Sequence, residues 1–466
     1  MGVLGFLKKQ NRIPKQTAKR IVYNRFCAVG SGENGSGALV ATASKNCDFA
    51  KRNLRGCVGL TRYKLKNEAL DIPLFPAEYG DAKDLFVFEY DNSGERKDCV
   101  GVVMGNNRFY IYDEMNGTPG LKLMATAIKF KRAVRVYSKT GDEKLLLCYN
   151  DAIYTYDPIK ATKSLWIEQK VTDACFFNER LFICYGNTLK YSAPTDYKNF
   201  DDSIDEGGEI RIVSDRGDIL QMVTVGEAAY VFLERGVYKL SLGGAGRDFI
   251  VEEMFYKGGP IVANSVCVCL NKIAFLAEDG IFVLDGVRVQ RYAEGLRIKW
   301  LSNMDYCRAG YGFGRYYLTF LDEKSVRRTV FVDLEDKGNF GEIFAMHGLG
   351  NWYGKVLATK NGYFSNLDVN GDLPVGEKSL FQCESTDFSV LGEKFLRSLQ
   401  LCGQGECTLT VKGRNGEKKL SYSLAGKQTL AVGLKGDLFS LKIELSKGCV
   451  IERLTVDLEK IGGGRK

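Results

Sequence analysis

Residues 228–242, AAYVFLERGVYKLSL, indicate how this chain folds. Two runs of apolar and alternating residues flank a short turn that contains Arg235 and Gly236. An alternating apolar run, a two-residue turn and a second alternating run predict a β-hairpin. A hairpin by itself cannot bury both of its faces, so further strands must pack against this one.

The same pattern occurs at six other places in the chain. These are GVVMGNNRFYIYDE, KLLLCYNDAIYTYDP, RLFICYGNTLKYSAP, KIAFLAEDGIFVLDG, YYLTFLDEKSVRRTVFVDL and KVLATKNGYFSNLD. The second turn residues of the seven hairpins are Asn107, Asp151, Asn187, Gly236, Gly280, Ser325 and Gly362, and consecutive ones are 36 to 49 residues apart. Such a period, with four strands in each unit, is typical of a β-propeller blade. We therefore predict an all-β chain with a six- or seven-bladed β-propeller over residues 81–375. β-Meanders packed as sandwiches are the alternative, without the steady spacing.

The two ends of the chain have different patterns. Residues 376–461 form a shorter meander, in which Asn415 and Gly416 mark a hairpin turn, and they predict a small C-terminal β-sandwich. Residues 462–466, GGGRK, predict a flexible tail. Residues 1–80 are interpreted as a basic N-terminal arm and connecting segment.

Charge is distributed unevenly along the chain. The net charge is +8, but residues 1–66 hold fourteen Lys or Arg against Glu33 and Asp48, a net of +12. The candidate partner-binding residues of this arm are Lys8, Lys9, Arg12, Lys15, Lys19, Arg20 and Arg25. They fit contacts with phosphates, docking on an acidic protein partner, or a solvated surface. No apolar run approaches the roughly 18 residues of a membrane helix, so no membrane span is expected.

An acidic stretch interrupts the strands at residues 191–212, YSAPTDYKNFDDSIDEGGEIRI. Its candidate partner-binding residues are Asp201, Asp202, Asp205 and Glu206. A glycosidase needs two carboxylates fixed at a defined separation, whereas these acids follow one another on one loop. A loop on a rigid blade is a suitable place for a partner contact, and we interpret the stretch in that way.

Few residues suggest catalysis or metal binding. The chain has one histidine, His347, and no CxxC pair, so we expect no metal, no cofactor and no enzymatic activity. Cys267 and Cys269 alternate in a strand-like run and are interpreted as small core residues. Cys402 and Cys407 could meet across a short hairpin, but reduced thiols are the favoured interpretation.

A resemblance to a known family adds a role. Tyr191 and Ser192 at a strand end, the Asp196, Asn199 and Phe200 loop, the hairpin of residues 231–238, and the later turns at Asp279-Gly280 and Asp285-Gly286 form one pattern. The stretch ESTDFSVLGEKFLRSLQL before the C-terminal strands belongs to it as well. This pattern resembles the β-propeller tail proteins of short-tailed bacteriophages, which include the tail-hub or nozzle proteins, also called packaged-DNA stabilisation proteins.

The resemblance implies a non-enzymatic virion component. Such a protein assembles as a homo-oligomeric ring near the portal vertex, after a period in the host cytoplasm. Its implied partners are portal, adaptor or neighbouring tail subunits, and non-specific contact with packaged DNA is an open alternative. The alternative function is a non-virion β-propeller interaction or glycan-binding module, and a propeller hydrolase is the third hypothesis.

Overall fold

The computed structural model shows a chain built almost entirely of β-strands. It describes residues 18–23, 25–27, 38–45, 47–49, 51, 53–56, 59–62, 79, 82, 84–92, 95–106, 108–113, 120–125, 130–137, 143–157, 162–202, 207–212, 215–243, 248–256, 259–294, 296, 307–337, 339–352, 355–360, 363–368, 381–385 and 388–460. Two compact units are present, one of residues 30–32 and 57–379 and one of residues 1–29, 33–56 and 380–466. No helix in the described ranges is both long and apolar enough to cross a membrane.

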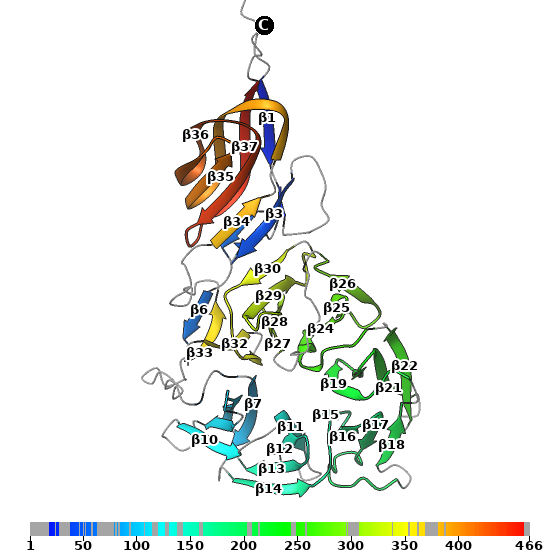
Figure 1. Ribbon diagram of the computed structural model, residues 1–466. Coiled ribbons are helices and arrows are strands. Elements are labelled where there is room, and N and C mark those ends of the chain that lie inside the picture. The colour runs from blue at the N-terminus through cyan, green and yellow to red at the C-terminus, as the bar shows by residue number, and fades with distance from the viewer. Residues whose placement is uncertain are drawn as a thin grey trace, which may run out of the picture. The chain divides into compact units, whose positions relative to one another are not determined.

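The larger unit contains seven groups of four hydrogen-bonded strands, which we call blades 1 to 7 (Figure 1). Blade 1 is β7 (Asp84–Asn92), β8 (Glu95–Val103), β9 (Phe109–Asp113) and β10 (Gly120–Ala125); blade 2 is β11 (Phe130–Tyr137), β12 (Glu143–Tyr149), β13 (Ile153–Asp157) and β14 (Thr162–Ile167). Blade 3 is β15 (Asp173–Phe177), β16 (Arg180–Tyr185), β17 (Thr188–Tyr191) and β18 (Gly208–Arg211); blade 4 is β19 (Ile219–Val225), β20 (Ala228–Leu233), β21 (Gly236–Leu242) and β22 (Phe249–Tyr256). Blade 5 is β23 (Cys267–Cys269), β24 (Lys272–Ala277), β25 (Gly280–Leu284) and β26 (Val289–Tyr292), preceded by the short 3-10 helix η3 (Ala263–Ser265). Blade 6 is β27 (Arg308–Gly312), β28 (Arg315–Leu321), β29 (Arg327–Asp333) and β30 (Phe340–Ile343); blade 7 is β31 (Leu349–Trp352), β32 (Lys355–Lys360), β33 (Tyr363–Asp368) and β6 (Gly59–Arg62).

The blades form a closed ring around an axis (Figure 1). The first strand of each blade contacts the first strand of the next, in the order β7, β11, β15, β19, β23, β27, β31 and back to β7. These seven strands are therefore the inner strands of a seven-bladed β-propeller. All seven hairpins predicted from the sequence are second and third strands of blades, which confirms the propeller and selects seven from the two predicted blade numbers.

Strand β20 shows why the blades pack in this way. Its six residues are all buried, because each face of the blade lies against a neighbouring blade. Ala229, Val231 and Leu233 pack in the core shared with blade 3, whereas Tyr230 and Phe232 pack in the core shared with blade 5. Successive side chains of a strand point to opposite faces, so one apolar run supplies two cores.

The ring is closed by strands from distant parts of the sequence. In blade 7, β6 pairs antiparallel with β33, with Leu60 opposite Leu367. The propeller thus includes residues 59–62, which the sequence analysis placed in a separate segment of residues 1–80. The predicted start of the propeller at residue 81 is therefore wrong. Blade 7 takes its outer strand from a segment far away in the sequence, and pairing between distant segments leaves no local sequence signal.

The smaller unit combines both ends of the chain. Its C-terminal strands are β34 (Phe381–Ser385), β35 (Phe388–Gly413), β36 (Gly416–Leu445) and β37 (Val450–Lys460), and its N-terminal strands are β1 (Ala18–Tyr23), β2 (Arg25–Cys27), β3 (Ala38–Lys45), β4 (Cys47–Asp48) and β5 (Leu54–Gly56). Strands β1 and β5 pair with β37, and β3 pairs with β34. The N-terminal segment is therefore part of this β unit where the structure describes it, whereas residues 462–466 lie outside the described ranges.

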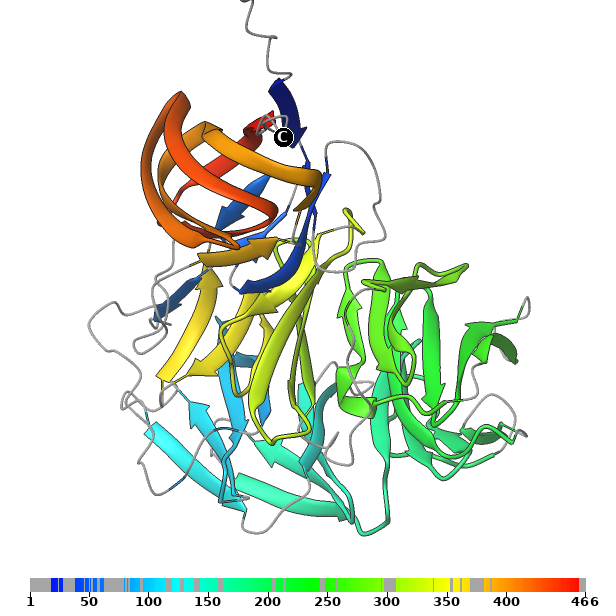
Figure 2. The same cartoon turned by 45° about the horizontal axis from the view of Figure 1, so that its top comes forward.

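Strand β36 bends strongly, as Figure 2 shows in orange. Leu409 of β35 pairs with both Leu420 and Ile443, so the two halves of β36 flank the same strand. Gly426 and Gly433 adopt positive φ values of 107° and 77° within β36. Glycine tolerates this backbone region without the steric cost that a side chain brings, which permits the bend.

Candidate functional site

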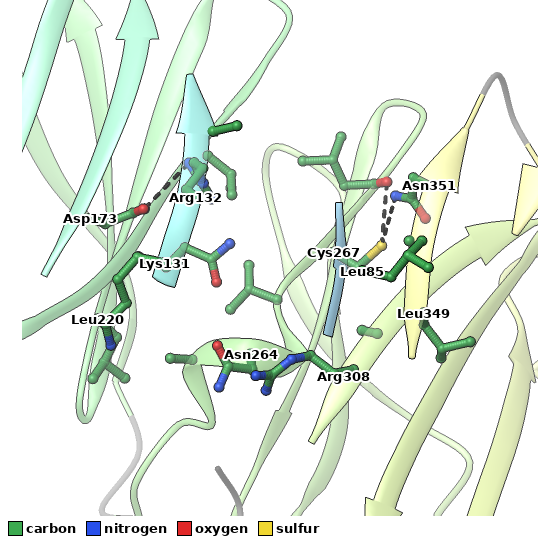
Figure 3. A pocket seen from close by; sticks show the side chains of 18 of the residues that line it. Leu85, Lys131, Arg132, Asp173, Leu220, Asn264, Cys267, Arg308, Leu349 and Asn351 are labelled. Carbon is green, nitrogen blue, oxygen red and sulfur yellow. Dashed lines mark hydrogen bonds and ion pairs between the residues drawn. The ribbon is translucent and has the colours of Figure 1, made fainter. Parts of the chain in front are cut away.

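The inner strands of the propeller begin around a cavity of about 360 Å³ (Figure 3). Every blade contributes to its lining. The polar or charged lining residues are Lys131 and Arg132 of blade 2, Thr172 and Asp173 of blade 3, Gln221 of blade 4, Asn264 and Cys267 of blade 5, Arg308 of blade 6 and Asn351 of blade 7, while blade 1 contributes Leu85. Each inner strand is the edge strand of its sheet, and an edge presents backbone groups that need other partners.

Arg132 connects three inner strands on one side of the cavity. Its Nη1 donates to the carbonyl of Ala174 on β15 at 3.2 Å and to that of Met222 on β19 at 2.6 Å. It also lies 3.3 Å from Oδ2 of Asp173, which accepts a hydrogen bond of 2.7 Å from the Met222 amide. The guanidinium and carboxylate thus satisfy edge groups of opposite polarity, and they pair with each other.

Gln221 extends this network to blade 5. In the amide orientation that satisfies both ends, its oxygen accepts from Nη2 of Arg132 at 2.6 Å and its nitrogen donates to the carbonyl of Ala263 at 2.5 Å. The side chains of Arg132, Asp173 and Gln221, which we call the charged network, therefore connect blades 2 to 5.

Burial and pairing oppose each other in the charged network. Burial raises the pKa of Asp173, and the Arg132 charge and the Met222 amide counter that rise. Burial is the largest single influence on the pKa of Arg132 and acts to lower it, but the charge interactions with Asp173, Cys175, Cys184 and Cys148 together outweigh burial, so the pKa of Arg132 is raised. We take the pair as ionised at neutral pH, because Asp173 has both a cation and a backbone donor within reach.

A neutral network occupies the opposite side. Oδ1 of Asn351 on β31 accepts a hydrogen bond of 2.6 Å from the amide of Tyr311 on β27. Its Nδ2 donates to Sγ of Cys267 on β23 at 3.2 Å, and Figure 3 shows the two side chains facing each other. Hydrogen bonding with Cys269 and Asn351 lowers the pKa of Cys267 despite its burial. Asn351 and Cys267, which we call the neutral network, connect blades 5 to 7.

The described lining of the cavity between the networks holds three basic side chains, Lys131, Arg132 and Arg308, and one carboxylate, Asp173. Acid–base or nucleophilic chemistry would need a base beside a nucleophile. In the described lining, Asp173 is paired with Arg132, and the contacts of Cys267 are an amide and a thiol. The described ranges hold no group of three or more His, Cys, Asp or Glu that could bind a metal ion.

The predicted basic residues lie in the smaller unit or outside the described ranges. Lys8, Lys9, Arg12 and Lys15 are not described. Lys19 and Arg20 lie on β1 and Arg25 lies on β2, and of these three only the Arg20 side chain is described. Its Nε lies 2.7 Å from Oδ1 of Asp457 on β37, although 68% of the side chain is exposed. Arg20 therefore has a partner within the chain.

The first half of the acidic stretch packs against a neighbouring blade. Tyr197 and Phe200 place their rings 5.5 Å and 6.3 Å from the ring of Trp166, which lies on the outer strand β14 of blade 2. The carbonyl of Asn199 accepts from the amide of Ala193 at 2.7 Å and closes the loop. This part of blade 3 therefore reaches back over blade 2, which explains a connection much longer than a hairpin turn.

The second half of the acidic stretch contains the predicted contact residues. Asp201 and Asp202 are exposed, and Asp205 and Glu206 lie outside the described ranges. Neither described aspartate lines the cavity, so the predicted partner contact at these residues does not involve the cavity.

The histidine and the cysteines considered for catalysis, metal binding or disulfides are described next by their burial and contacts. His347 is half-buried between β30 and β31, and its backbone amide donates to the carbonyl of Thr359. Cys402 and Cys407 are both free thiols, and Cys267 and Cys269 are both buried, as expected for small core residues.

The cavity residues are not among the candidate residues predicted from the sequence. Arg132, Asp173, Arg308 and Asn351 each lie within the first three residues of an inner strand. An alignment of the seven repeats from their first strands would have placed these polar residues at one level of the ring. The turns between second and third strands, from which the repeat was recognised, do not contain these residues.

The chain is a β-propeller protein with an additional β unit, and comparisons leave its family open. No family model matches the chain, and no curated protein matches it in sequence. A catalytically inactive virginiamycin B lyase from Staphylococcus aureus, solved with quinupristin, is 9% identical, with a TM-score of 0.37, 66% of this chain and 99% of that chain covered.

Two extracellular domains from B. thetaiotaomicron are also similar. That of a putative one component system is 10% identical, with a TM-score of 0.43, and the match covers 88% of this chain and 63% of that one. That of a putative hybrid two component system is 11% identical, with a TM-score of 0.41, and the match covers 87% of this chain and 61% of that one. Function does not follow from likeness at this level, so the fold assignment rests on the seven sheets of the chain itself.

Proposed function

We propose that this protein is a non-enzymatic β-propeller assembly protein, and that its particular role is that of a tail-hub or nozzle-type component of a phage virion. The observation that carries the proposal is that polar and charged side chains at the axis connect the inner strands to one another. Arg132 and Asp173 hold inner strands together, and Asn351 joins Cys267 to Tyr311. A rigid ring with its polar groups engaged in this way suits a scaffold.

The resemblance supplies the virion part of the proposal. Its residues fall in or beside the third strands of three consecutive blades. Tyr191 ends the third strand of blade 3 and Ser192 follows it, residues 231–238 form the hairpin of blade 4, and Asp279-Gly280 and Asp285-Gly286 lie at the two ends of the third strand of blade 5. In this proposal, copies of the chain form a ring near the portal vertex and contact portal, adaptor or neighbouring tail subunits.

The proposal also gives a role to the basic arm and to the acidic stretch. The basic arm (Lys8, Lys9, Arg12, Lys15) would dock on acidic surfaces of neighbouring subunits, of which Asp201 and Asp202 are the described candidates. Replacing these four cations by glutamine should weaken assembly, most strongly at low salt, because exposed charges are screened as ionic strength rises. Oligomers unchanged at low salt would argue against this contact.

The decisive experiment is mass spectrometry of sedimented, nuclease-treated particles from induced cultures of the source organism. We expect peptides of this chain in a fixed ratio to capsid and portal peptides. Their absence from abundant particles would reject the virion role.

A free interaction or glycan-binding module is the second candidate. The cavity of about 360 Å³ with polar groups from six blades favours it, since ligand sites are concave and hold a few convergent polar groups. A glycan array distinguishes this candidate, because a virion scaffold needs no glycan signal, whereas specific glycan binding that is lost on Asn264→Leu substitution supports the module.

A further inference from the structure

Two buried thiols face each other in the smaller unit. Sγ of Cys407, on β35, donates a hydrogen bond to Sγ of Cys449, which lies in the turn before β37. Both are free thiols, and they are exposed by only 5% and 0%. Cys402 is nearer to Cys407 in the sequence, but both belong to the continuous strand β35, and five residues of extended chain hold their sulfurs apart.

Backbone contacts attach the turn that carries Cys449 to β35. The amide and Oγ of Ser446 both donate to the carbonyl of Glu406, at 2.9 Å and 2.6 Å. The amide of Cys449 donates in turn to the carbonyl of Ser446 at 3.1 Å. Val450, the next residue, is paired with Gln404 in the ladder between β35 and β37. The turn is therefore fixed directly beside the thiol of β35.

Gly405 gives this turn the room to approach β35. Its φ of 88° lies in the left-handed region, which glycine adopts readily. A Cβ atom at this position would lie 2.8 Å from Cα and 3.1 Å from Cβ of Cys449. Any side chain at position 405 would therefore push Cys449 away from β35, and the contact between the two thiols depends on the glycine.

The hydrogen bond makes the two sulfurs chemically unequal. It lowers the pKa of Cys449 against the effect of burial, and it raises the pKa of Cys407, to which burial adds. The thiolate is the nucleophile in thiol–disulfide exchange, so Cys449 is the attacking residue and Cys407 the resolving one. Lys447 and Gly448 at the tip of the turn are exposed, so opening of this turn brings Cys449 to solvent.

We propose that Cys407 and Cys449 form an intrachain disulfide when the chain meets a low-molecular-weight disulfide such as glutathione disulfide. The Cys449 thiolate attacks one sulfur of glutathione disulfide, which forms a mixed disulfide and releases one glutathione. Cys407 then attacks the Cys449 sulfur, and the second glutathione leaves with the proton that Cys407 gives up. Two protein thiols are oxidised, and one small disulfide is reduced to two thiols.

This disulfide closes a loop that contains all of β36 and ties β35 to the start of β37. A cross-link restricts the unfolded chain, so oxidation should raise the thermal unfolding midpoint of the protein by several degrees. A reducing cytoplasm keeps such thiols reduced, and the link is expected where the chain meets oxidising conditions. The proposal goes beyond the assembly role, because it concerns the covalent state of a single chain.

Peptide mapping without reduction tests the link in the folded full chain. The protein is incubated with glutathione disulfide, its free thiols are trapped with N-ethylmaleimide, and the tryptic peptides are analysed by mass spectrometry. We expect the peptide of residues 398–412 to be linked to the peptide of residues 448–453. The proposal is overturned if the folded wild-type chain gives no such link.

Three variants assign the link, because the peptide of residues 398–412 contains Cys402 as well as Cys407. Cys407→Ala and Cys449→Ala should each abolish it and the rise in midpoint. Cys402→Ala is the matched control on the same strand and should keep both.

Thermal unfolding under reducing conditions establishes that each variant is folded, and the Cys402→Ala map remains decisive if the other two are not. Loss of the link in Cys402→Ala would overturn the proposal, because Cys402 would then be the partner of Cys449. A link that persists in folded Cys407→Ala would overturn it for the same reason.

Discussion

The two sides of the propeller axis differ in the side chains that satisfy the backbone groups of the inner strands. Both must provide partners for backbone groups at the edges of inner strands. Across blades 2 to 5 the charged network does so, with Arg132 and Asp173 exposed by only 22% and 5%. Across blades 5 to 7 the neutral network does so, and its Asn351 is exposed.

This difference indicates where a substitution should destabilise the ring most. A buried ion pair gains much from mutual attraction, but each ion depends on the other, because an unpaired buried charge is costly. An exposed amide can exchange its partners for water at little cost. We therefore expect substitutions in the charged network to act more strongly than substitutions in the neutral network.

The largest effect is expected for Asp173→Ala. It leaves the Arg132 guanidinium buried without its counter-charge and the Met222 amide without its acceptor. The free energy of unfolding should fall by about 3–5 kcal/mol, measured by urea unfolding. Asp202→Ala is the control, since Asp202 is exposed and its loss should change little. Equal urea midpoints for the two variants would show that the charged network does not hold the ring.

A double variant sharpens this result. Arg132→Met combined with Asp173→Leu removes both charges, and buried ion pairs are often replaced by apolar residues without loss of stability. The double variant should therefore be more stable than Asp173→Ala alone. A double variant that is less stable would show that the hydrogen bonds to Ala174 and Met222 matter more than the charges.

The next effect concerns Gly350, at the junction of blade 7 with blade 1. A Cβ atom at this position would lie 2.7 Å from Cδ2 and 3.0 Å from the carbonyl oxygen of Leu85. Gly350→Ala should lower the free energy of unfolding by about 1–3 kcal/mol through overpacking. Gly310→Ala on β27 is the matched comparison, because its Cβ would meet nothing closer than 3.3 Å. A greater loss for Gly310→Ala would contradict this account of the closure.

A smaller effect is expected for Asn351→Ala in the neutral network. The substitution removes the acceptor for the Tyr311 amide and the donor for the Cys267 thiol. The free energy of unfolding should fall by about 0.5–1.5 kcal/mol. The pKa of Cys267 should rise, since the Asn351 hydrogen bond lowers it, and peptide-mapped alkylation against pH measures this shift. A loss as large as that of Asp173→Ala would remove the contrast between the two networks.

The smallest effect is expected for Arg20→Gln, which tests an exposed ion pair against the buried one. The Arg20 hydrogen bond, followed by that of Ser398, lowers the pKa of Asp457 below its ordinary value of 3.8. A lowered folded pKa contributes stability that is present above the unfolded value and lost as pH falls through the folded one.

Thermal unfolding at low salt should therefore show a slightly lower midpoint for Arg20→Gln at neutral pH and a difference that shrinks below pH 3.8. Arg453→Gln is the control, because Arg453 is an exposed cation on the same strand, β37. A difference that grows in acid would contradict the assigned role of the pair.

The repeats were predictable, whereas the site was not. Gly236 and Gly280 mark second-to-third strand turns that local residue chemistry specifies, and they lie where the sequence predicts them. Arg132 and Asp173 are 41 positions apart, and nothing near either residue indicates the other. Their pairing depends on the ring bringing β11 and β15 together, so single-repeat patterns do not show it.

By itself, the sequence determined that this protein is built of repeated β-hairpins, because alternating side chains and turn residues act over a few positions and need no distant partner. Only the tertiary structure decided that β6 closes blade 7, that the N-terminal strands join the C-terminal unit, and that one side of the axis is held by charge. These features are pairings between distant segments, which exist only once the ring has formed.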